Sequence, residues 1–406
     1  MVHLRWEGDV FLDYEKEPPK LLDESQIKDL NGDLYVAKGL WQEIISHYEK
    51  EEVLDRLRHL INTGAIAFPY KDYLELSVRE EFNKLKNSAS YFYQDNWICN
   101  RLVQDVPFLY RGKSRYIPSV ARLGGKVSDL FTQEVRMEVG HQRFMSPMRA
   151  WNSKKKAFLS YIFNPDMFEG DLNNKALRSA LSMRSYIASQ FKPESAKVVY
   201  DTFQAKRVLD FSAGWGDRLV GFHASNAESY IGIDPNSKLH EPYQKISDFC
   251  GTDKEVKLIC SPAEEADLTG VKVDFVFTSP PYFTLERYSD EDTQSWKRYP
   301  KINAWLEGFL FPTLFKCWKC LEDGGRILVN IADAYTNGER EEICQPMLRY
   351  MESLGATYEG VLGYQMGGRP GANMDNVGKV FCEPIWVWSK GEAPEPKWNS
   401  ETSLGF

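Results

Sequence analysis

A short apolar strand, a Gly-x-Gly turn and the start of a helix follow one another within residues 207–219 of this 406-residue chain. Glycine is needed where the backbone passes close to a ligand, and the first turn of the next helix offers it unpaired N–H groups. A second strand ends in Asp234 about twenty residues on, where an open α/β sheet places the carboxylate that binds ribose hydroxyls. The dinucleotide-binding fingerprint Gly-x-Gly-x-x-Gly has its third glycine at the position where this chain has Leu219. The pattern therefore predicts an α/β fold with a different nucleotide-derived cofactor.

A second apolar strand, from Asp274, runs directly into Thr278-Ser279-Pro280-Pro281-Tyr282. Two consecutive prolines fix φ and supply no backbone donors, so they hold a short rigid loop whose carbonyls stay available as acceptors. The expected ligand of such acceptors is an amine. The alternative is that the prolines only end a strand.

This loop resembles the Ser/Asp/Asn-Pro-Pro-Tyr signature of methyltransferases that modify exocyclic amino groups of nucleobases, the DNA N4-cytosine and N6-adenine enzymes. In that family the polar residue and a proline carbonyl hold the two amino hydrogens, and the tyrosine stacks on the base. The resemblance implies catalytic roles for Ser279, Pro280, Pro281 and Tyr282, with Phe283 as a further clamp on the base. The family's cofactor turn usually reads Asp-Pro-Phe-x-Gly-Ser-Gly-Thr, which Asp210, Gly214 and Gly216 match and Phe211, Ser212, Trp215 and Asp217 do not.

The resemblance also implies S-adenosylmethionine as the cofactor. A segment before the first strand is similar to the one that closes over the methionine end, and a segment after the third strand, expected at Val256 to Ile259, should border the adenine ring. The alternative for both segments is an ordinary helix start. The implied cofactor-binding residues are Phe191, Lys192, Pro193, Asp210, Phe211, Ser212, Ala213, Gly214, Trp215, Gly216, Asp234, Pro235, Ser261, Ala263 and Glu264.

The order of the remaining elements predicts a Rossmann-like α/β sheet of seven strands, mostly parallel with one reversed strand. A helix is expected from Ala304 to Cys320, a strand from Arg326 to Ile331, and a late hairpin of residues 358–364 and 380–388 whose loop contains Gly367 to Gly371. We expect this domain to cover residues 186–390. Residues 1–185 should form a largely helical domain for substrate recognition, and residues 391–406 a mobile tail.

The net charge of −8 is unusual for a nucleic-acid enzyme, because contacts from Lys and Arg to phosphates usually dominate binding. Residues 111–156, however, hold eleven basic and three acidic side chains, which predicts a phosphate-binding surface with Arg143, Lys154, Lys155 and Lys156; the alternative is a solvated basic face. We expect the insert from Thr284 to Trp305, which contains Arg287, Lys297 and Arg298, to hold the nucleic-acid strand or the extruded base.

Other features limit the class of protein. No apolar run is long enough to span a membrane, and seven scattered cysteines fit a reducing compartment, so we expect a cytoplasmic protein. Cys317 and Cys320 lie in an expected helix without a second pair or nearby histidines, so we expect packing and no metal site. Apolar residues at helical spacing, such as Leu40, Ile44, Ile45 and Tyr48, predict core helices before residue 62.

Serine in the first position of the loop is commoner among enzymes that methylate cytosine N4. The favoured prediction is therefore a DNA methyltransferase acting on that amino group. Adenine N6 and RNA are the alternatives within the same chemistry, and DNA is favoured over RNA as the partner. A different class of answer is a catalytically inactive methyltransferase-like module that binds nucleic acid. The oligomeric state and target sequence do not follow from the sequence.

Overall fold

The computed structural model describes residues 19–24, 27–29, 32–89, 91–94, 98–99, 106–118, 122–164, 170–336, 338–366 and 380–398. The chain forms two compact units: a first unit of residues 1–70 and 150–184, and a sheet unit of residues 71–149 and 185–406. We expected one boundary at residue 185. The chain does return to the sheet unit at Ser185, but residues 71–149 belong to the sheet unit as well.

The first unit is mostly helical, with α1 (Lys38–His47), α2 (Lys50–Asn62), a 3-10 helix (Ala157–Phe163) and α6 (Asn174–Ser182). A two-residue strand β1 (Tyr35–Val36) pairs with β6 (Leu172–Asn173), so both parts of the chain contribute. A capping box between Glu49 and Glu52 starts α2. Its apolar stripe is buried, as expected, together with Ile44, whereas Ile45 is exposed.

The central sheet of the second unit has the predicted seven strands in the order β15-β16-β12-β10-β7-β8-β9. All neighbours pair in parallel except β16, which runs antiparallel to both β12 and β15. This confirms the predicted fold class. The bounds are β7 (Arg207–Asp210), β8 (Ser229–Asp234), β9 (Glu255–Cys260), β10 (Val273–Thr278), β12 (Leu321–Asn330), β15 (Thr357–Gln365) and β16 (Val380–Ser389). The Gly367 to Gly371 loop lies outside the described residues.

Three short strands that were not predicted extend this sheet beyond the seven. β4 (Arg115–Ile117) pairs in parallel with β15, β2 (Tyr93–Gln94) pairs with β4, and β3 (Ile98–Cys99) pairs with β16. They come from residues 71–149, which explains why that part of the chain belongs to the sheet unit.

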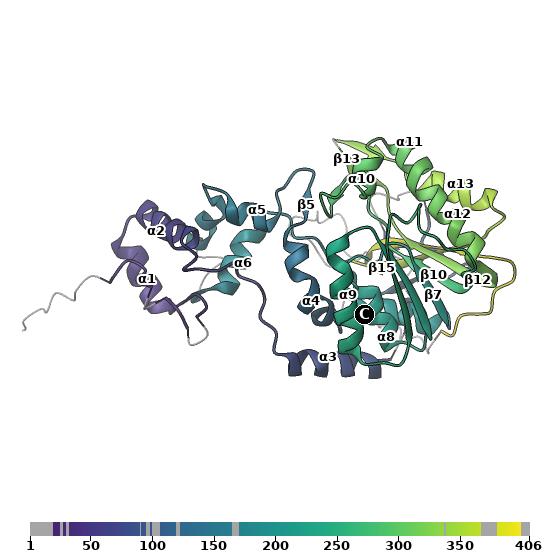
Figure 1. The fold of residues 1–406 in the computed structure, drawn as a ribbon, viewed down its shortest axis with the longest axis horizontal. Coiled ribbons are helices and arrows are strands. Elements are labelled where there is room, and N and C mark those ends of the chain that lie inside the picture. The colour runs from purple at the N-terminus through teal and green to yellow at the C-terminus, as the bar shows by residue number, and fades with distance from the viewer. Residues whose placement is uncertain are drawn as a thin grey trace, which may run out of the picture. The chain divides into compact units, whose positions relative to one another are not determined.

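Helices cover both faces of the sheet (Figure 1). Successive side chains of a strand point to opposite faces, so Val208 and Phe277 join one core while Leu209 and Val276 join the other. The first core includes α3 (Glu75–Asn87), α4 (Gly125–Met137), α7 (Pro193–Thr202), α8 (Asp217–Ala224) and α9 (His240–Cys250); the second includes α11 (Ile302–Trp305), α12 (Phe311–Cys320) and α13 (Cys344–Ser353).

The helix expected from Ala304 to Cys320 contains a π-helical turn at Leu306–Leu310 between α11 and α12. Gly308 lies in this turn against the ring of Tyr299, where an added Cβ would come within 2.3 Å of a ring carbon. A π turn often marks a functional segment, and this one contributes Phe309 to the cavity described below. Cys317 and Cys320 are buried in the core, as expected for packing residues.

The start of the expected mobile tail is packed instead. Trp398 contacts the rings of Phe92 and Tyr110, and the guanidinium of Arg115 lies 4.0 Å from its ring centroid. Lys397 N donates to the carbonyl of Thr202 over 2.7 Å. The expectation is therefore wrong for residues 391–398, and residues 399–406 lie outside the described part of the chain.

A buried carboxylate connects three segments of the sheet unit. Glu359 of β15 accepts hydrogen bonds from Tyr110 Oη (2.6 Å), Arg111 Nη2 (2.7 Å) and Arg326 Nε (2.9 Å). Burial alone would raise the pKa of Glu359, but the hydrogen bonds from Arg326 and Tyr110 bring that pKa below its usual value. The lowered pKa means that this carboxylate stabilises the fold above its unfolded-state pKa, and that the stabilisation is lost as the pH falls through the folded-state pKa.

We expect Glu359→Gln to lower the free energy of unfolding by about 3 kcal/mol, because it leaves the buried guanidinium of Arg326 without its carboxylate. Urea denaturation at pH 7 measures this loss, with Glu352→Gln, an exposed change on α13, as the control. The difference between wild type and Glu359→Gln should shrink at acidic pH. Equal stabilities at pH 7 would contradict the prediction.

Candidate active site

A cavity of about 770 Å³ opens at the carboxyl ends of the sheet strands. Residues that follow β7, β8, β10 and β12 line it, together with residues 189–192 before α7 and the end of β15. Ligands of open α/β sheets bind at this edge, because the loops after parallel strands meet there. The cavity lies entirely within the sheet unit.

The glycine turn after β7 forms one wall of the cavity. Gly214 and Gly216 have φ values of 59° and 77°, a region that favours glycine, and an added Cβ on Gly216 would lie 2.7 Å from Ile246 Cδ1. Gly214 N donates to Asp234 Oδ2 over 2.9 Å, which fixes the turn to the end of β8. The turn residues Phe211, Ser212, Ala213, Gly214 and Trp215 line the cavity, whereas Gly216 lies behind it.

Asp210 does not line the cavity, contrary to its implied role in cofactor binding. Its carboxylate is fully buried, pairs with Arg218 Nε (2.8 Å) and accepts from Tyr230 Oη (2.7 Å) and Ser212 N (3.2 Å). Arg218 in turn donates to the carbonyl of Ser212 and itself borders the cavity. Asp210 therefore shapes the turn from within the core.

Asp234 and Pro235, which were predicted to bind the cofactor, lie at the end of β8 and line the cavity. The carboxylate of Asp234 accepts from Gly214 N and Asn236 N, both over 2.9 Å. Burial raises its pKa to about 6 in spite of these two donors. Each carboxylate oxygen can accept a second hydrogen bond, so Asp234 can still bind a pair of hydroxyl groups.

The segment before α7 forms the opposite wall. Phe191 stacks on Tyr364 of β15, with ring centroids 4.7 Å apart, and Lys192 Nζ donates to the carbonyl of Gln365. Trp215, which departs from the family turn, donates from Nε1 to the carbonyl of Ser189 and so connects the two walls. Phe191 and Lys192 line the cavity, whereas Pro193 is buried at the first turn of α7.

The segment after β9 contributes Ala263 and Glu264 to the cavity but not Ser261. Burial raises the pKa of Glu264, whose Oε1 accepts from Arg298 Nη1 (2.8 Å) and Tyr299 Oη (3.1 Å). Arg298 therefore serves this internal ion pair and does not line the cavity, which corrects its predicted role as a substrate contact.

The Pro-Pro loop leaves the end of β10 and lines the cavity with Ser279, Pro280, Pro281 and Tyr282. Ser279 Oγ lies 3.4 Å from Asn330 Oδ1, and Asn330 Nδ2 donates to the carbonyl of Pro384 over 3.0 Å. The amide of Asn330 thus holds the serine from the neighbouring strand. Burial, followed by the charge of Glu383, raises the pKa of Tyr282 well above its usual value.

Phe283 is not a clamp on the base. It is 4% exposed, does not line the cavity, and its ring packs against Trp305 in the core with centroids 6.1 Å apart. Its φ of 54° lies in the left-handed region that non-glycine residues rarely adopt. The burial of its ring maintains this conformation, and the chain returns to the cavity lining at Leu285 and Glu286.

The predicted basic contacts divide into several groups. Arg143 is exposed and lines the cavity, whereas Arg287 lies over the ring of Trp296 and Lys297 pairs with Asp292, both away from the cavity lining. Lys154 and Lys155 are exposed in the first unit. Lys156 is buried and donates to the carbonyl of Trp151, so its predicted phosphate contact is wrong.

The basic side chains of residues 111–156 therefore do not form one surface. Arg115 and Arg136 are buried as well, the first against Trp398 and the second in an ion pair with Asp129. The segment is also divided between the two units after Arg149.

Several cavity residues were not predicted. Glu286 accepts from the hydroxyls of both Tyr186 and Tyr288, and the ring of His141 lies 4.8 Å from that of Tyr186. Glu286 belongs to β11 (Glu286–Arg287), which pairs with β5 (Gly140–His141), so two distant segments build this group. Asn330 could have been found as a polar residue at a strand end, but the pairing of β5 with β11 has no visible signal in the sequence.

No three His, Cys, Asp or Glu side chains in the described ranges are grouped so that they could hold a metal ion. Among the helices that the structure describes, none is both long enough and apolar enough to cross a membrane.

Comparison with known proteins gives one family match and many structural ones. Residues 273–402 match the DNA methylase family N6_N4_Mtase. No curated protein matches the chain at a significant level.

Three of the similar solved structures illustrate the structural matches. A SAM-dependent O-methyltransferase from Thermotoga maritima is 13% identical over 50% of this chain and 67% of its own, with a TM-score of 0.32. A SAM-dependent methyltransferase from Thiobacillus denitrificans, in complex with S-adenosyl-L-homocysteine, is 22% identical over 34% and 48% (TM-score 0.26), and one from Agrobacterium tumefaciens is 19% identical over 49% and 60% (TM-score 0.32). The last two are thus matched over less than two thirds of their own length.

The family match covers the strand that leads into the Pro-Pro loop, the loop itself and the strands that follow it. The match also supports S-adenosylmethionine as the cofactor. The cavity walls fit this cofactor, because they contain an acidic residue at a strand end and a glycine turn. Residues 273–402 therefore match the DNA methylase family, which confirms the resemblance that the Ser279 to Tyr282 loop indicated.

Proposed function

We propose that the protein transfers a methyl group from S-adenosylmethionine to the exocyclic amino group of a DNA base, with cytosine N4 favoured. One observation carries this proposal: the Ser279 to Tyr282 loop and the Gly214 to Asp234 region open onto the same cavity. A cofactor held at the glycine turn and an amine held at the Pro-Pro loop would therefore share one enclosed space.

The loop supplies the groups that such a reaction needs. An exocyclic amine is conjugated with its ring and is a poor nucleophile, so both hydrogens must be held by acceptors that direct the nitrogen lone pair. Ser279 Oγ and the Pro280 carbonyl are two such acceptors, and Asn330 fixes the serine. The bound cofactor supplies an electrophilic methyl group on a sulfonium. Positive charge develops on the nitrogen, so acceptors aimed at the amine stabilise the transition state.

The preference for cytosine rests on the serine. A neutral hydroxyl is shorter than the carboxylate or amide that the related adenine enzymes usually carry in this position, so it suits an amine held close to β10. Adenine N6 and RNA remain the alternatives, and the experiment below distinguishes them.

The test is methylation of DNA and RNA substrates with isotopically labelled cofactor, followed by mass spectrometry of the released nucleosides. We expect label in N4-methyldeoxycytidine. Label in N6-methyldeoxyadenosine or in ribonucleosides would select one of the alternatives. Cofactor binding without any labelled nucleoside, over a broad set of sequences, would favour the inactive binding module.

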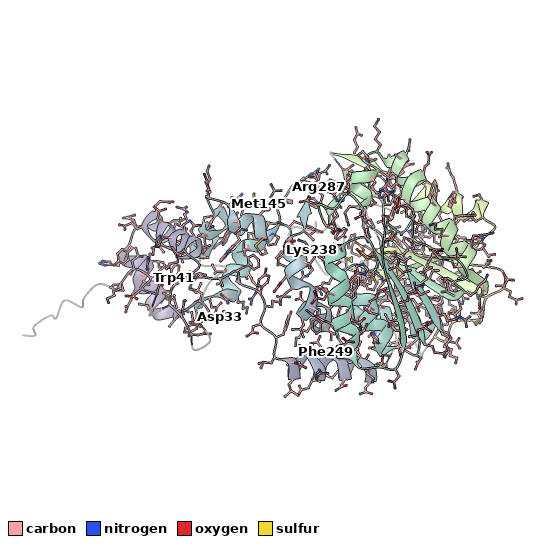
Figure 2. All side chains as sticks on the ribbon, in the orientation of Figure 1. Asp33, Trp41, Met145, Lys238, Phe249 and Arg287 are labelled. Carbon is pink, nitrogen blue, oxygen red and sulfur yellow. The ribbon has the colours of Figure 1, made fainter. Side chains whose placement is uncertain are left out.

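The rim of the cavity carries a second feature that fits nucleic acid. Phe144 and Met145 are 54% and 45% exposed beside Arg143, in the segment that follows β5, and Phe144 lines the cavity. The charges of Arg143 and Arg287 both act on the pKa of His141, which burial lowers first. Met145 follows β5 and Arg287 belongs to β11, which pairs with β5; both residues are labelled in Figure 2. A cationic rim with exposed apolar side chains suits a phosphate backbone and an opened base step.

We expect Arg143→Ala to weaken DNA binding uniformly over sequences and to reduce the slope of log K against log salt by about one. Phe144→Ala should instead leave that slope unchanged and weaken binding about tenfold, because it removes an apolar contact worth about 1 to 3 kcal/mol. Fluorescence anisotropy with labelled duplex at several salt concentrations measures both. Arg349→Ala, an exposed arginine on α13, is the matched control, and an equal slope change there would contradict the prediction.

A further inference from the structure

Asp217, a residue of the cavity lining, carries a buried carboxylate oxygen without a hydrogen-bond donor in the described part of the chain. This residue opens α8 directly after the glycine turn, is 2% exposed and lines the cavity. Its Oδ1 accepts from Ser128 Oγ and from Gln190 Nε2, whereas its Oδ2 has no hydrogen-bond partner within the described part of the chain. A buried acceptor without a donor is costly, which indicates that a ligand supplies the donor.

The two arginines near Asp217 are paired with other carboxylates and not with Asp217 itself. Arg218 follows it on α8, and Arg136 and Asp129 approach it from α4. Both arginines are committed elsewhere, Arg218 to Asp210 and Arg136 to Asp129. Burial raises the pKa of Asp217 to about 7, because these neighbours only partly offset the loss of water. A bound cation would stabilise the charged carboxylate at this position.

The position of Asp217 selects one part of the cofactor. Asp234 contacts the first glycine of the turn, while Asp217 follows the last one and is tied through Gln190 to the segment before α7. The two acids therefore lie at the two ends of the turn. S-adenosylmethionine has a ribose in its nucleoside part and a primary ammonium in its amino-acid part, so the two acids match groups at its two ends.

We propose that Asp217 Oδ2 binds the α-ammonium group of the cofactor's amino-acid part. This inference rests on the proposed cofactor site and adds a residue that the family pattern does not supply, because threonine stands there in the family turn. Asp210, the acid that the chain shares with that pattern, has its partners inside the protein and cannot take this role.

The test compares three ligands on wild type and Asp217→Asn by calorimetry: S-adenosylhomocysteine, its analogue without the amino group, and 5′-methylthioadenosine, which lacks the amino-acid part. The asparagine keeps the shape and the bond from Ser128. We expect Asp217→Asn to weaken S-adenosylhomocysteine binding about tenfold to 150-fold, the range for a lost charged hydrogen bond, and to leave the other two ligands within about twofold. Equal weakening of all three would mean a structural role and would overturn the proposal.

A second measurement uses only the wild-type protein, so it does not depend on the folding of the variant. Protonated Asp217 cannot pair with an ammonium, so affinity for S-adenosylhomocysteine relative to 5′-methylthioadenosine should fall as the pH drops below about 7. The ratio removes the contribution of Asp234, which should affect both ligands. A ratio that does not change with pH would overturn the proposal.

Two further comparisons separate this inference from the cofactor site itself. Asp234→Ala should weaken all three ligands, and if it weakens none of them, the proposed cofactor site fails while the Asp217 comparison still gives its own answer. If Asp217→Asn weakens S-adenosylmethionine much more than S-adenosylhomocysteine, the carboxylate pairs with the sulfonium, and the ammonium assignment is overturned.

Discussion

Replacing Ser279 by alanine should lower the turnover number for methyl transfer by about 10³-fold while S-adenosylhomocysteine affinity stays within about twofold. The serine hydroxyl is one of two acceptors that orient the amine, and loss of one preorganised hydrogen-bonding group typically costs 10² to 10³ in turnover. Asn330 Oδ1, which now lies 3.4 Å from Ser279 Oγ, would keep its own position through Pro384. Single-turnover kinetics with saturating cofactor measures the effect.

Tyr282→Ala should fail in a different way, because it removes a stacking surface worth about 1 to 3 kcal/mol and should appear mainly in binding of the base. Ser279→Asp keeps an acceptor but adds charge and length, so activity that survives there would suit adenine. Ser353→Ala, an exposed change on α13, is the control for both variants. Wild-type turnover of Ser279→Ala on every substrate, or a product methylated on a ring carbon, would rule out the proposed reaction.

Replacing Asp234 by alanine should weaken binding of S-adenosylhomocysteine and 5′-methylthioadenosine alike, by about 10³-fold. The change removes the acceptor for two ribose hydroxyls, and hydrogen bonds to a charged group are worth about 1.5 to 3 kcal/mol each. It also leaves Gly214 N without its partner, which loosens the turn itself. Calorimetry measures the affinities, and Asp253→Ala, at an exposed loop position, is the control.

The pH dependence of the wild type gives an independent check on Asp234. Burial raises its pKa to about 6, and only the carboxylate can accept from both hydroxyls. Affinity for 5′-methylthioadenosine should therefore be constant above pH 7 and should fall as the pH drops below about 6. Unchanged affinity in a folded Asp234→Ala protein would exclude this site for the cofactor.

The sheet of this protein could be predicted from its sequence because the relevant signals are local. Apolar strands followed by Gly214 and Gly216, by Asp234 and by Ser279 mark successive strand ends, and parallel strand order brings such ends together. The reversed strand followed from the late hairpin in the same way. What local patterns cannot provide is pairing over long distances, so the three strands from residues 71–149 and the pairing of β5 with β11 were missed.

The errors in the candidate site have a common cause. A residue type predicts what a side chain can do, but burial and partners decide whether it does so. Asp210 and Arg298 had suitable chemistry and are occupied by Arg218 and Glu264 within the protein. Phe283 and Lys156 are buried, and a sum of charges along 46 residues does not identify a surface when three of its cations are buried. Asp217, by contrast, was noted only as a mismatch, and its environment makes it informative.

The discontinuous first unit has a consequence for synthesis on the ribosome. Its core combines Leu54 and Leu57 with Leu159 and Leu177, and β1 pairs with β6, so residues 19–70 have no complete partner until residue 184 has emerged. By then residues 71–149 are already outside, although the strands that they extend have not yet been made. Domains generally fold as units during translation, from the amino terminus onward. Here the first unit can fold before the strands of the sheet unit have been synthesised, while residues 71–149 still lack their sheet partners. Nascent chains in which residue 184 has just emerged should therefore expose α3 and α4 to chaperones.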